Sequence, residues 1–314
     1  MPLPIDVIIN AASGTSDKED ERQILADLFS ANDVKARIEL AKSGAEIVEM
    51  AKRAVKSKSL TIVAGGGDGT VSAVAAELVG TEKILGVLPL GTLNHFAKDL
   101  NIPLDLEEAA RAIIAGHVAK VDVGEINGHI FINNSSLGLY PDIVRRREQR
   151  QRLGYGKWNS LFRSAFKVLR RYPFLDIRLN ADGKEIVTRT PFVFVGNNSY
   201  EMESFNIGGR TCLDAGHLSL YMTPRAGRFG LLQMALRALF GKLRQAKDFV
   251  SFCTDEVWIE TRHRQLRVAM DGEVLMLETP LHYRVRPAAL RVIVPAKTED
   301  ETSERASEEA VEKE

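Results

Sequence analysis

Apolar runs of strand length alternate with segments of helical period over roughly the first 120 residues. The pattern predicts strands at residues 5–10, 34–40, 59–64 and 84–90, and helices at residues 19–30, 44–56, 70–79 and 106–115. Strands that alternate with helices in this way pair in parallel. The first part is therefore predicted to be a parallel sheet with helices on both faces.

The pattern changes at about residue 121. Short and often alternating apolar stretches now follow one another, separated by turn residues such as Asn127-Gly128 and Asp182-Gly183. Such dipeptides favour tight hairpins, so the second part is predicted to be mainly antiparallel. The stretches lie at residues 121–126, 128–136, 175–180, 184–197, 217–223, 256–261, 266–273 and 281–286.

Two domains and a tail follow from these patterns. Residues 1–122 are predicted to form the first domain and residues 123–297 the second. The last strand of the second domain could also return to the sheet of the first. Residues 298–314 carry eight acidic residues against two basic ones and almost no large apolar residue. This tail is predicted to be solvated and disordered.

Composition narrows the class of protein. Hydrophobic residues make up 45% and charged residues 27% of the 314 residues, which is typical of a soluble globular protein. The 42 basic residues balance the 42 acidic ones, so no overall positive charge points to nucleic acid. The two cysteines, Cys212 and Cys253, form no CxxC pair, and the N-terminal MPLPIDVIIN lacks the basic and long apolar regions of a signal peptide. We expect a cytoplasmic protein whose membrane contact is peripheral.

The stretch SLTIVAGGGDGT, residues 59–70, places glycines between a buried strand and a helix expected to begin at about Thr70. Backbone N–H groups that no side chain covers, together with the positive end of a helix dipole, attract an anion such as phosphate. The stretch matches neither the GxGxxG dinucleotide fingerprint nor the Walker lysine loop. The alternative is a simple tight turn, but four glycines in five positions around Asp68 favour an anion site.

A second segment, PLGTLNHFAKDLNIP at residues 89–103, joins GGGDGT in a resemblance. Together they resemble the diacylglycerol kinase and sphingosine kinase family of lipid kinases, particularly its bacterial soluble branch. Asn-Ala-Ala-Ser-Gly at residues 10–14 is similar to the family's NPxSG loop, with Ala11 in place of proline. FINNSSLG at 131–138, VGNN at 195–198 and DGE at 271–273 follow in the family's order, so the similarity covers about residues 5–295.

This resemblance implies a fold and a reaction. The fold would be α/β plus β: a parallel α/β domain like those of phosphofructokinases and NAD kinases, then an antiparallel β-sandwich, with the active site in the cleft between them. The reaction would move the γ-phosphoryl group of ATP to a lipid hydroxyl. Diacylglycerol, which would give phosphatidic acid, is the leading acceptor, with sphingosine or ceramide next. By the resemblance, the nucleotide is held by Asn10, Ala11, Ala12, Ser13, Gly14, Gly65, Gly66, Gly67, Gly69, Thr70 and Thr92.

Phosphoryl transfer needs Mg²⁺ on the phosphates, fixed N–H donors and a base near the attacking hydroxyl. Asp68 is placed to orient a catalytic Mg²⁺, since Mg²⁺ prefers carboxylate and water oxygen. The alternative is that Asp68 only caps the following helix. The resemblance makes Glu273 the general base and Asp271 its neighbour. Two alternatives remain open: DGE is an ordinary hairpin turn with exposed carboxylates, or Asp68 is the base.

One position departs from the family pattern. Many members have an LDDG stretch whose second acid holds a structural Mg²⁺, whereas residues 213–216 here are Leu-Asp-Ala-Gly. Ala215 stands at the ligand position, and the side chain of Asp214 is one residue out of register. We expect this structural site to be weakened or absent, while the Mg²⁺ bound with ATP is unaffected.

Two basic amphipathic segments indicate membrane contact. Residues 145–171 contain ten Lys and Arg against one acid, and residues 225–247 contain six against none, each with apolar residues at helical spacing. Such segments bind anionic lipid surfaces. The alternative is that the apolar stripes pack on the sandwich. No nucleic-acid recognition motif accompanies them, and the sequence does not decide between a monomer and a homodimer.

Two other functions stay open beside the lipid kinase. An NAD kinase-like enzyme would share GGDGT, but PLGTLNHF and the basic segments favour a lipid acceptor. A catalytically silent sensor of lipid or nucleotide would have kept the fold; Ala215 favours it, and the intact Asp68 and Glu273 oppose it.

Overall fold

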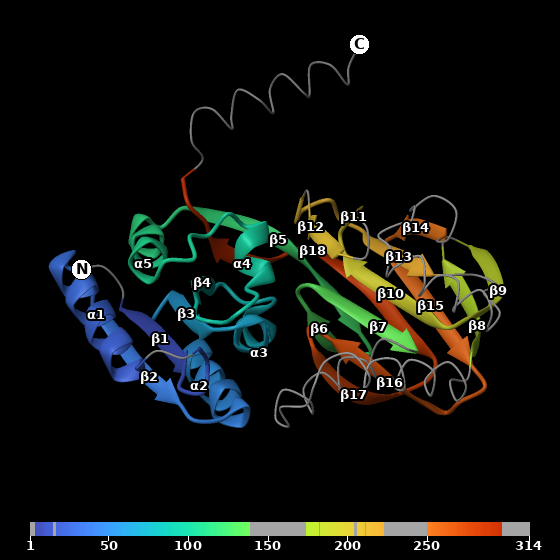
Figure 1. Cartoon of the computed structure of the whole chain (residues 1–314), viewed down its shortest axis with the longest axis horizontal. Coiled ribbons are helices and arrows are strands. Elements are labelled where there is room, and N and C mark those ends of the chain that lie inside the picture. Colours follow the sequence, from blue (N-terminus) through green and yellow to red (C-terminus); the bar gives the residue numbers. More distant parts are fainter. Residues whose placement is uncertain are drawn as a thin grey trace, which may run out of the picture. The chain divides into compact units, whose positions relative to one another are not determined.

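The computed structural model describes residues 4–14, 17–138, 174–181, 183–203, 206–210, 212–222 and 250–296 (Figure 1). The basic segments at 145–171 and 225–247 and the acidic tail at 298–314 lie outside the described residues. The chain divides into two compact units. Unit 1 holds the residues up to Ala119 and those from Arg291 on, and unit 2 holds Lys120–Leu290.

Unit 1 is built on the predicted parallel sheet. The strands run in the order β2-β1-β3-β4, and the end of a last strand pairs with β4 through Arg291 and Val292. Their bounds are β1 (Ile5–Asn10), β2 (Ala36–Ala41), β3 (Thr61–Gly66), β4 (Ile84–Pro89) and β18 (Leu281–Ile293). The central strands are apolar and almost wholly buried, as strands covered on both faces must be.

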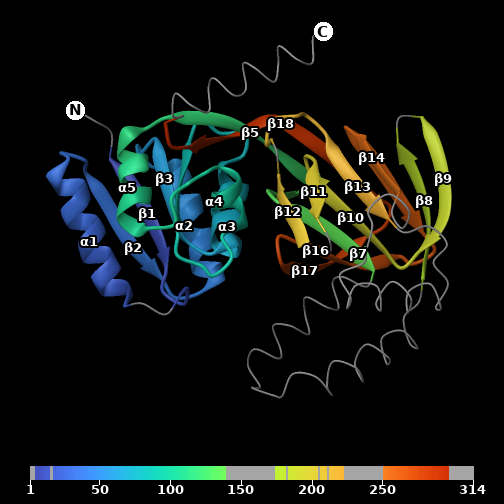
Figure 2. The same cartoon turned by 45° about the horizontal axis from the view of Figure 1, so that its top comes forward.

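Helices cover both faces of this sheet. Helix α1 packs against α5, and α2 packs against α3, and right-handed crossovers place the two pairs on opposite faces (Figures 1 and 2). The bounds are α1 (Lys18–Ala31), α2 (Gly44–Lys56), α3 (Asp68–Leu78), α4 (His95–Asp99) and α5 (Leu106–Ala115). The side chains of Asp17, Ser43 and Asp105 cap α1, α2 and α5 by accepting first-turn N–H groups.

The structure of unit 1 differs from the sequence-based expectation at one helix start and contains one helix that was not predicted. Helix α3 begins at Asp68 rather than at about Thr70, with Gly67 as its N-cap residue. Glycine is a poor helix former, which moved the predicted start beyond Gly69, but the carbonyl of Gly67 already accepts the N–H groups of Thr70 and Val71. Helix α4 was not predicted, because its five residues are too few to show a helical period.

Unit 2 has two larger antiparallel sheets, which confirm the predicted sandwich, and a two-stranded sheet of β11 and β12. One sheet has the order β14-β13-β10-β7-β16-β17; in the other, β18 pairs with β5 and β15, β15 with β8, and β8 with β9. The bounds are β5 (Val118–Ile126), β6 (His129–Phe131), β7 (Asn134–Gly138), β8 (Leu175–Ala181), β9 (Lys184–Thr190), β10 (Phe192–Asn197), β11 (Tyr200–Glu203), β12 (Asn206–Arg210), β13 (Leu218–Met222), β14 (Val250–Thr254), β15 (Glu256–Thr261), β16 (Gln265–Met270) and β17 (Glu273–Glu278).

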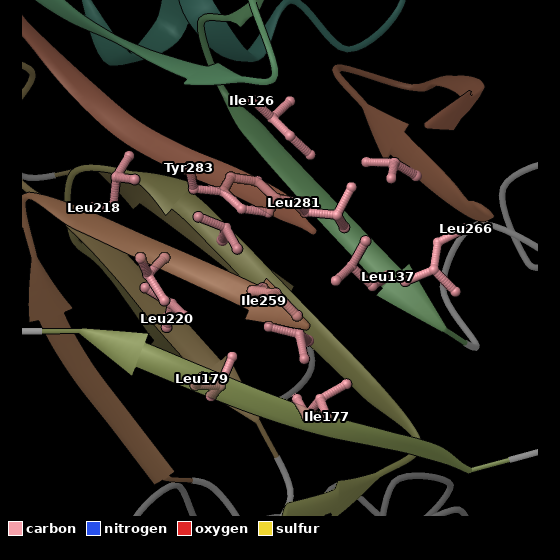
Figure 3. Close-up of a cluster of buried hydrophobic side chains, with 14 of the residues drawn as sticks. Ile126, Leu137, Ile177, Leu179, Leu218, Leu220, Ile259, Leu266, Leu281 and Tyr283 are labelled. Carbon is pink, nitrogen blue, oxygen red and sulfur yellow. The ribbon is translucent and has the colours of Figure 1, made fainter. Parts of the chain in front are cut away.

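The core of unit 2 is formed by the facing sides of these sheets. Alternate residues of each strand are buried together; Figure 3 labels Ile126, Leu137, Ile177, Leu179, Leu218, Leu220, Ile259, Leu266, Leu281 and Tyr283. The buried Tyr283 hydroxyl lies 3.0 Å from Ser135 Oγ, which gives this polar group a partner. Burial raises the pKa of Tyr283, and the hydrogen bond with Ser135 offsets only part of that effect.

The hairpin turns of unit 2 were predicted more accurately than the strands at the edges of its sheets. Asn127 and Gly128, both with positive φ, form the predicted two-residue turn between β5 and β6, and Gly183 lies between β8 and β9. Strands β11, β12, β14 and β17 were not predicted as separate strands. The last two are edge strands of their sheet, and both are largely exposed, so their sequences lack a clear alternation.

Strand β5 belongs to both units, since it begins at Val118, and the expected domain boundary at residues 122–123 falls within it. Its residue Glu125 accepts hydrogen bonds from Arg284, at 2.7 Å, and from Arg286, at 3.2 Å, both on β18. Burial raises the pKa of Glu125, but the hydrogen bonds and charges of the two guanidinium groups outweigh it, so the pKa lies below its usual value. Among the described helices, none is long and apolar enough to cross a membrane.

Glu125→Gln is expected to lower the free energy of unfolding by about 1 kcal/mol at pH 7, because solvent screens two arginines that are each nearly half exposed. The lowered pKa means that the stabilisation is complete above the unfolded-state pKa of about 4.3 and is lost as the pH falls through the folded-state value. Melting temperatures of both proteins between pH 3.5 and 7 should therefore converge only at the acidic end. Glu185→Gln, whose partner Arg178 is exposed, is the control and should have little effect. Equal melting temperatures for wild type and Glu125→Gln at pH 7 would contradict the prediction.

Candidate active site

The carboxyl ends of β1 and β3 form a switch point in the sheet of unit 1. The two strands pair directly, with Ile9 opposite Gly65, while the chain leaves β1 toward α1 and leaves β3 toward α3, on the other face. Ligands of open α/β sheets bind where adjacent crossovers leave in opposite directions. The two loops that follow these strands are the predicted nucleotide loops, residues 10–14 and 65–70.

Asn10 joins these two loops. Its Nδ2 donates to Thr70 Oγ1 at 3.0 Å, and its Oδ1 accepts the N–H of Ala12 at 2.9 Å. The hydroxyl of Ser13 donates to the Asn10 carbonyl at 2.8 Å, and Gly14 has a positive φ that favours glycine. One side chain therefore fixes the shape of the first loop and its position against the first turn of α3.

The glycines of the second loop serve close packing rather than a reversal of the chain. None of Gly65, Gly66, Gly67 or Gly69 has a positive φ. A Cβ on Gly66 would lie 2.4 Å from Thr70 Oγ1, and one on Gly67 would lie 3.3 Å from the Cα of Gly91. Close packing is therefore the reason for glycine at Gly66, where a Cβ has no room, and at Gly67, where a Cβ would be tight against the backbone of Gly91.

Gly69 differs from the other three glycines. A Cβ built there meets no atom within 4 Å, and the residue is exposed in the first turn of α3. The space above it lies beside the free N–H groups of a helix start, where an anion is stabilised. Gly69 is therefore the position in this loop that packing leaves unexplained and that a bound phosphate would explain.

Asp68 does not cap its own helix; no side chain does so at this end of α3. Its Oδ1 accepts the N–H of Phe96 in α4 at 3.2 Å, while its second oxygen has no partner among the described residues. Asp68 thus ties α4 to the start of α3 and keeps one oxygen free, which fits a carboxylate that binds Mg²⁺ or its waters. No group of three or more His, Cys, Asp and Glu side chains in the described ranges could hold a metal by itself, so Mg²⁺ would need phosphate or water oxygens as well.

Thr92 lies in the loop between β4 and α4 and is exposed. The shape of this loop comes from Asn94, which the sequence analysis passed over. The buried Asn94 has a φ of 51°, accepts the Gly91 N–H at 3.1 Å, and donates to the carbonyls of Pro89 and Gly91. Asparagine tolerates this left-handed conformation better than most residues. An asparagine shortly after a glycine in this loop is therefore the sequence signal that could have identified Asn94.

In unit 2, Asp271 and Gly272 form a two-residue hairpin turn between β16 and β17, with positive φ at both residues. The Asp271 carboxylate nonetheless points inward to residues 132–134, here called the asparagine strap. It accepts the N–H groups of Ile132 at 2.8 Å, Asn133 at 2.9 Å and Asn134 at 3.1 Å. The DGE stretch is thus a hairpin turn, but the carboxylate of Asp271 is a structural acceptor and not a free base.

Glu273 contrasts with Asp271. It is the first residue of β17, lies opposite Met270, and is exposed. Its carboxylate has no hydrogen-bond or ion-pair partner among the described residues. Of the two acids in the DGE turn, Glu273 alone is free to accept a proton from a substrate hydroxyl. Its catalytic role stays a prediction.

The LDAG stretch, residues 213–216, is held by two side chains that accept its backbone N–H groups. Asn198 Oδ1 accepts the Ala215 N–H at 3.2 Å, and Asp122 Oδ2 accepts the Gly216 N–H at 2.7 Å. Ala215 offers no side-chain ligand to a metal, and Asp214 is exposed. Asp122, which is buried and also accepts the Ala288 N–H, was missed because a single acid in an apolar strand gives no motif.

Comparisons with known proteins bear on the family and the fold of the chain. Residues 4–126 match the family model described as the diacylglycerol kinase catalytic domain, and residues 142–294 match that of the YegS C-terminal NAD kinase beta sandwich-like domain. Curated diacylglycerol kinases of Staphylococcus aureus, strains JH9 and Newman, are 29% identical over 179 residues, which is 56% of this chain and only 56% of each relative.

Solved structures support the fold. A diacylglycerol kinase structure from Bacillus anthracis str. Sterne has a TM-score of 0.69 at 21% identity and covers 93% of this chain and 96% of its own. A second structure from the same organism has a TM-score of 0.73 at 23% identity and covers 93% and 97%. At this level of identity the likeness concerns the fold alone.

Gly66→Ala and Gly69→Ala are expected to separate packing from ligand binding. The added methyl at residue 66 has no room beside Thr70 and should destabilise unit 1 by about 1–3 kcal/mol. At residue 69 the methyl meets open space in a helix and should stabilise the fold by up to about 1 kcal/mol, while an anion site at this turn would be weakened and ATP, used as the probe, should bind less tightly. Thermal unfolding and calorimetric ATP titration measure the two effects. An unchanged dissociation constant for ATP in Gly69→Ala would contradict an anion site at this turn.

Proposed function

Because the chain belongs to the diacylglycerol kinase family of lipid kinases, we propose that it transfers the γ-phosphoryl group of ATP to a lipid hydroxyl. Diacylglycerol is the preferred acceptor, and phosphatidic acid the product. The observation that carries the proposal is the hydrogen bond from Asn10 to Thr70, which joins two loops at the switch point beside the open space at Gly69. This is where an α/β sheet holds the phosphates of a nucleotide.

In this proposal unit 1 binds ATP. The loop from Asn10 to Gly14 and the turn from Gly65 to Thr70 supply backbone N–H groups and small side chains for the phosphates. Thr92 adds a hydroxyl from the loop after β4. Asp68 would hold Mg²⁺ or its waters through the carboxylate oxygen that does not accept the Phe96 N–H. The bound Mg²⁺ supplies charge neutralisation on the phosphates, which is most of what phosphoryl transfer requires.

Unit 2 supplies the base. Glu273 accepts the proton of the attacking hydroxyl, and its exposed carboxylate is available to do so. Asp271 has no such freedom, since a proton on its carboxyl would face the three N–H donors of the asparagine strap. We therefore assign Asp271 to the support of the turn and Glu273 to proton transfer.

The acceptor is presented at a membrane. Residues 145–171 and 225–247 together carry sixteen Lys and Arg, and their basic amphipathic character supports binding to an anionic lipid surface. Each basic residue close to such a surface contributes roughly 1 kcal/mol. This attraction would raise the local concentration of enzyme near its lipid substrate and would fall with added salt.

Transfer of ³²P from γ-labelled ATP tests the reaction and its acceptor together. With Mg²⁺, label is expected in diacylglycerol before sphingosine or ceramide, and more strongly in vesicles that contain phosphatidylglycerol than in pure phosphatidylcholine. The excess in anionic vesicles should shrink as salt rises. Label in NADP from a soluble NAD control would instead support an NAD kinase-like enzyme. No label anywhere, from protein with a cooperative melting transition, would support a silent sensor.

Asp68→Asn and Glu273→Gln are each expected to lower kcat by at least about 10²-fold, because each removes a carboxylate proposed to bind Mg²⁺ or to take a proton. The melting temperature should stay close to that of wild type, because the amide oxygen introduced at residue 68 can still accept the Phe96 N–H and Glu273 has no side-chain partner among the described residues. Steady-state phosphorylation of diacylglycerol measures the effect. Glu278→Gln, on the same strand as Glu273 and also exposed, is the matched control and should keep wild-type turnover. Normal turnover in both test variants would overturn the site assignment.

A further inference from the structure

We propose that Arg210 is a positioning residue for Glu273, which it reaches through the asparagine strap and the Asp271 turn. The inference rests on the proposed function, because it gives Glu273 the role of base. Arg210 ends β12 and had no role in the sequence analysis. It is buried, with 6% of its surface exposed, although arginine is rarely buried so completely.

Arg210 contacts the strap on the side opposite Asp271. One terminal nitrogen donates to the carbonyl of Ile132 at 2.6 Å, and the other donates to Asn133 Oδ1 at 2.9 Å. The first nitrogen also lies 3.3 Å from the Asn197 carbonyl. A planar guanidinium with several fixed donors suits such a site, where a lysine would offer only a point charge.

The strap is therefore held between a cation and an anion. In the peptide group that joins Ile132 to Asn133, the carbonyl accepts from Arg210 and the N–H donates to Asp271. In the next peptide group, the Asn133 carbonyl accepts from the Asn197 N–H and the Tyr200 hydroxyl, and the Asn134 N–H donates to Asp271. Two successive peptide groups thus turn their N–H ends toward the Asp271 carboxylate and their carbonyl ends toward donors, and charged partners make such hydrogen bonds shorter and stronger.

Tyr200 supports this arrangement. Its hydroxyl donates to the Asn133 carbonyl at 2.9 Å, and the Arg210 guanidinium lies 5.6 Å from its ring centroid, within the range of a cation–π contact. The backbone of Tyr200 is in turn bonded to the Tyr221 hydroxyl. The guanidinium is therefore fixed in place as well as charged, and it fixes the strap in turn.

The strap influences the position of Glu273 because it fastens the turn that immediately precedes this residue, while the Glu273 backbone pairs with Met270 at the end of the β16–β17 ladder. Asp271 is fastened to the strap by its carboxylate and by its own N–H, which donates to the Asn134 carbonyl at 3.0 Å. Gly272 is exposed, and the Glu273 carboxylate has no hydrogen-bond or ion-pair partner among the described residues. A shift of the strap therefore moves the turn and carries the Glu273 carboxylate with it. A displacement of about 1 Å can cost on the order of 10²-fold in rate.

Arg210→Gln tests the inference in the full-length protein with diacylglycerol as acceptor. We expect kcat to fall about tenfold to a hundredfold with little change in the KM for ATP, because the proposed ATP loops belong to unit 1. Arg210→Lys, which keeps the charge but not the fork, should lie between wild type and Arg210→Gln. Arg178→Gln, which removes an exposed arginine of the same unit, is the control and should keep wild-type turnover.

A double-variant cycle separates positioning from a general structural role. If Arg210 acts through Glu273, Arg210→Gln should lower kcat in wild type but not further in Glu273→Gln. Amide hydrogen exchange should also become faster at Ile132, Asn133 and Asn134. If Arg210→Gln proves too unstable to assay, the same cycle with Arg210→Lys decides the question.

Two results would overturn the inference, and they are distinguishable from failure of the proposed function. An inactive Glu273→Gln together with a fully active Arg210→Gln would remove the positioning role alone. Equal fractional losses from Arg210→Gln in both backgrounds would show a structural role that does not run through Glu273. A fully active Glu273→Gln would instead remove the proposed base, and with it the premise of the inference.

Discussion

Both units shape their loops with one kind of interaction, in which a short acid or amide side chain hydrogen-bonds to backbone groups of its own loop or of a neighbouring one. Backbone groups at the ends of strands have lost their partners in the sheet, and a buried group without a partner is costly. In unit 1, Asn10 binds the Ala12 N–H, Asp68 binds the Phe96 N–H, and Asn94 binds three groups of the loop after β4. These three side chains place the ends of β1, β3 and β4 as one framework, which lies where a phosphate would bind.

Unit 2 uses the same interaction, but here each of two acids accepts hydrogen bonds from more than one backbone N–H group. Asp271 satisfies three N–H groups of the asparagine strap, and Asp122 satisfies those of Gly216 and Ala288. Asp122 thereby joins β5, the LDAG stretch and β18, three segments far apart in the sequence. The Ala288 N–H needs such a partner because Ala288 has a positive φ, which interrupts the regular pairing of β18.

Much of the fold could be predicted from the sequence because its signals are local. The apolar strands 5–10 and 84–90 and the helices at residues 44–56 and 106–115 have clear periods and capping residues, and the structure places them within a residue of the prediction. The predicted hairpin at Asn127-Gly128 follows from the positive φ that both residues tolerate. Helix α4 and strand β14 could not be predicted in this way, because their residues are ordered by contacts with distant segments rather than by a local pattern.

In the candidate site, too, the local motifs could be found in the sequence, but the contacts between distant residues could not. Motifs identified the loops, but the partner of each side chain lies far along the chain: Asn10 meets Thr70, Asp68 meets Phe96, and Asp271 meets the strap at residues 132–134. Sequence alone therefore could not tell which acid of the DGE turn is free. Arg210 was beyond reach for the same reason, since a lone arginine at the end of a short strand resembles any exposed base.

The two acids of the DGE turn show how one short hairpin can meet opposite requirements. A general base must keep a lone pair free for a proton, whereas a support must engage its lone pairs with fixed donors. Asp271 lies in the two-residue turn and Glu273 directly follows it, so their side chains face different surroundings: Asp271 turns inward to the strap, while Glu273 begins an exposed strand. The inward acid gives the turn its rigidity without taking part in proton transfer. The outward acid, Glu273, has a defined position and keeps its carboxylate free to accept a proton, because Asp271 makes the hydrogen bonds that hold the turn.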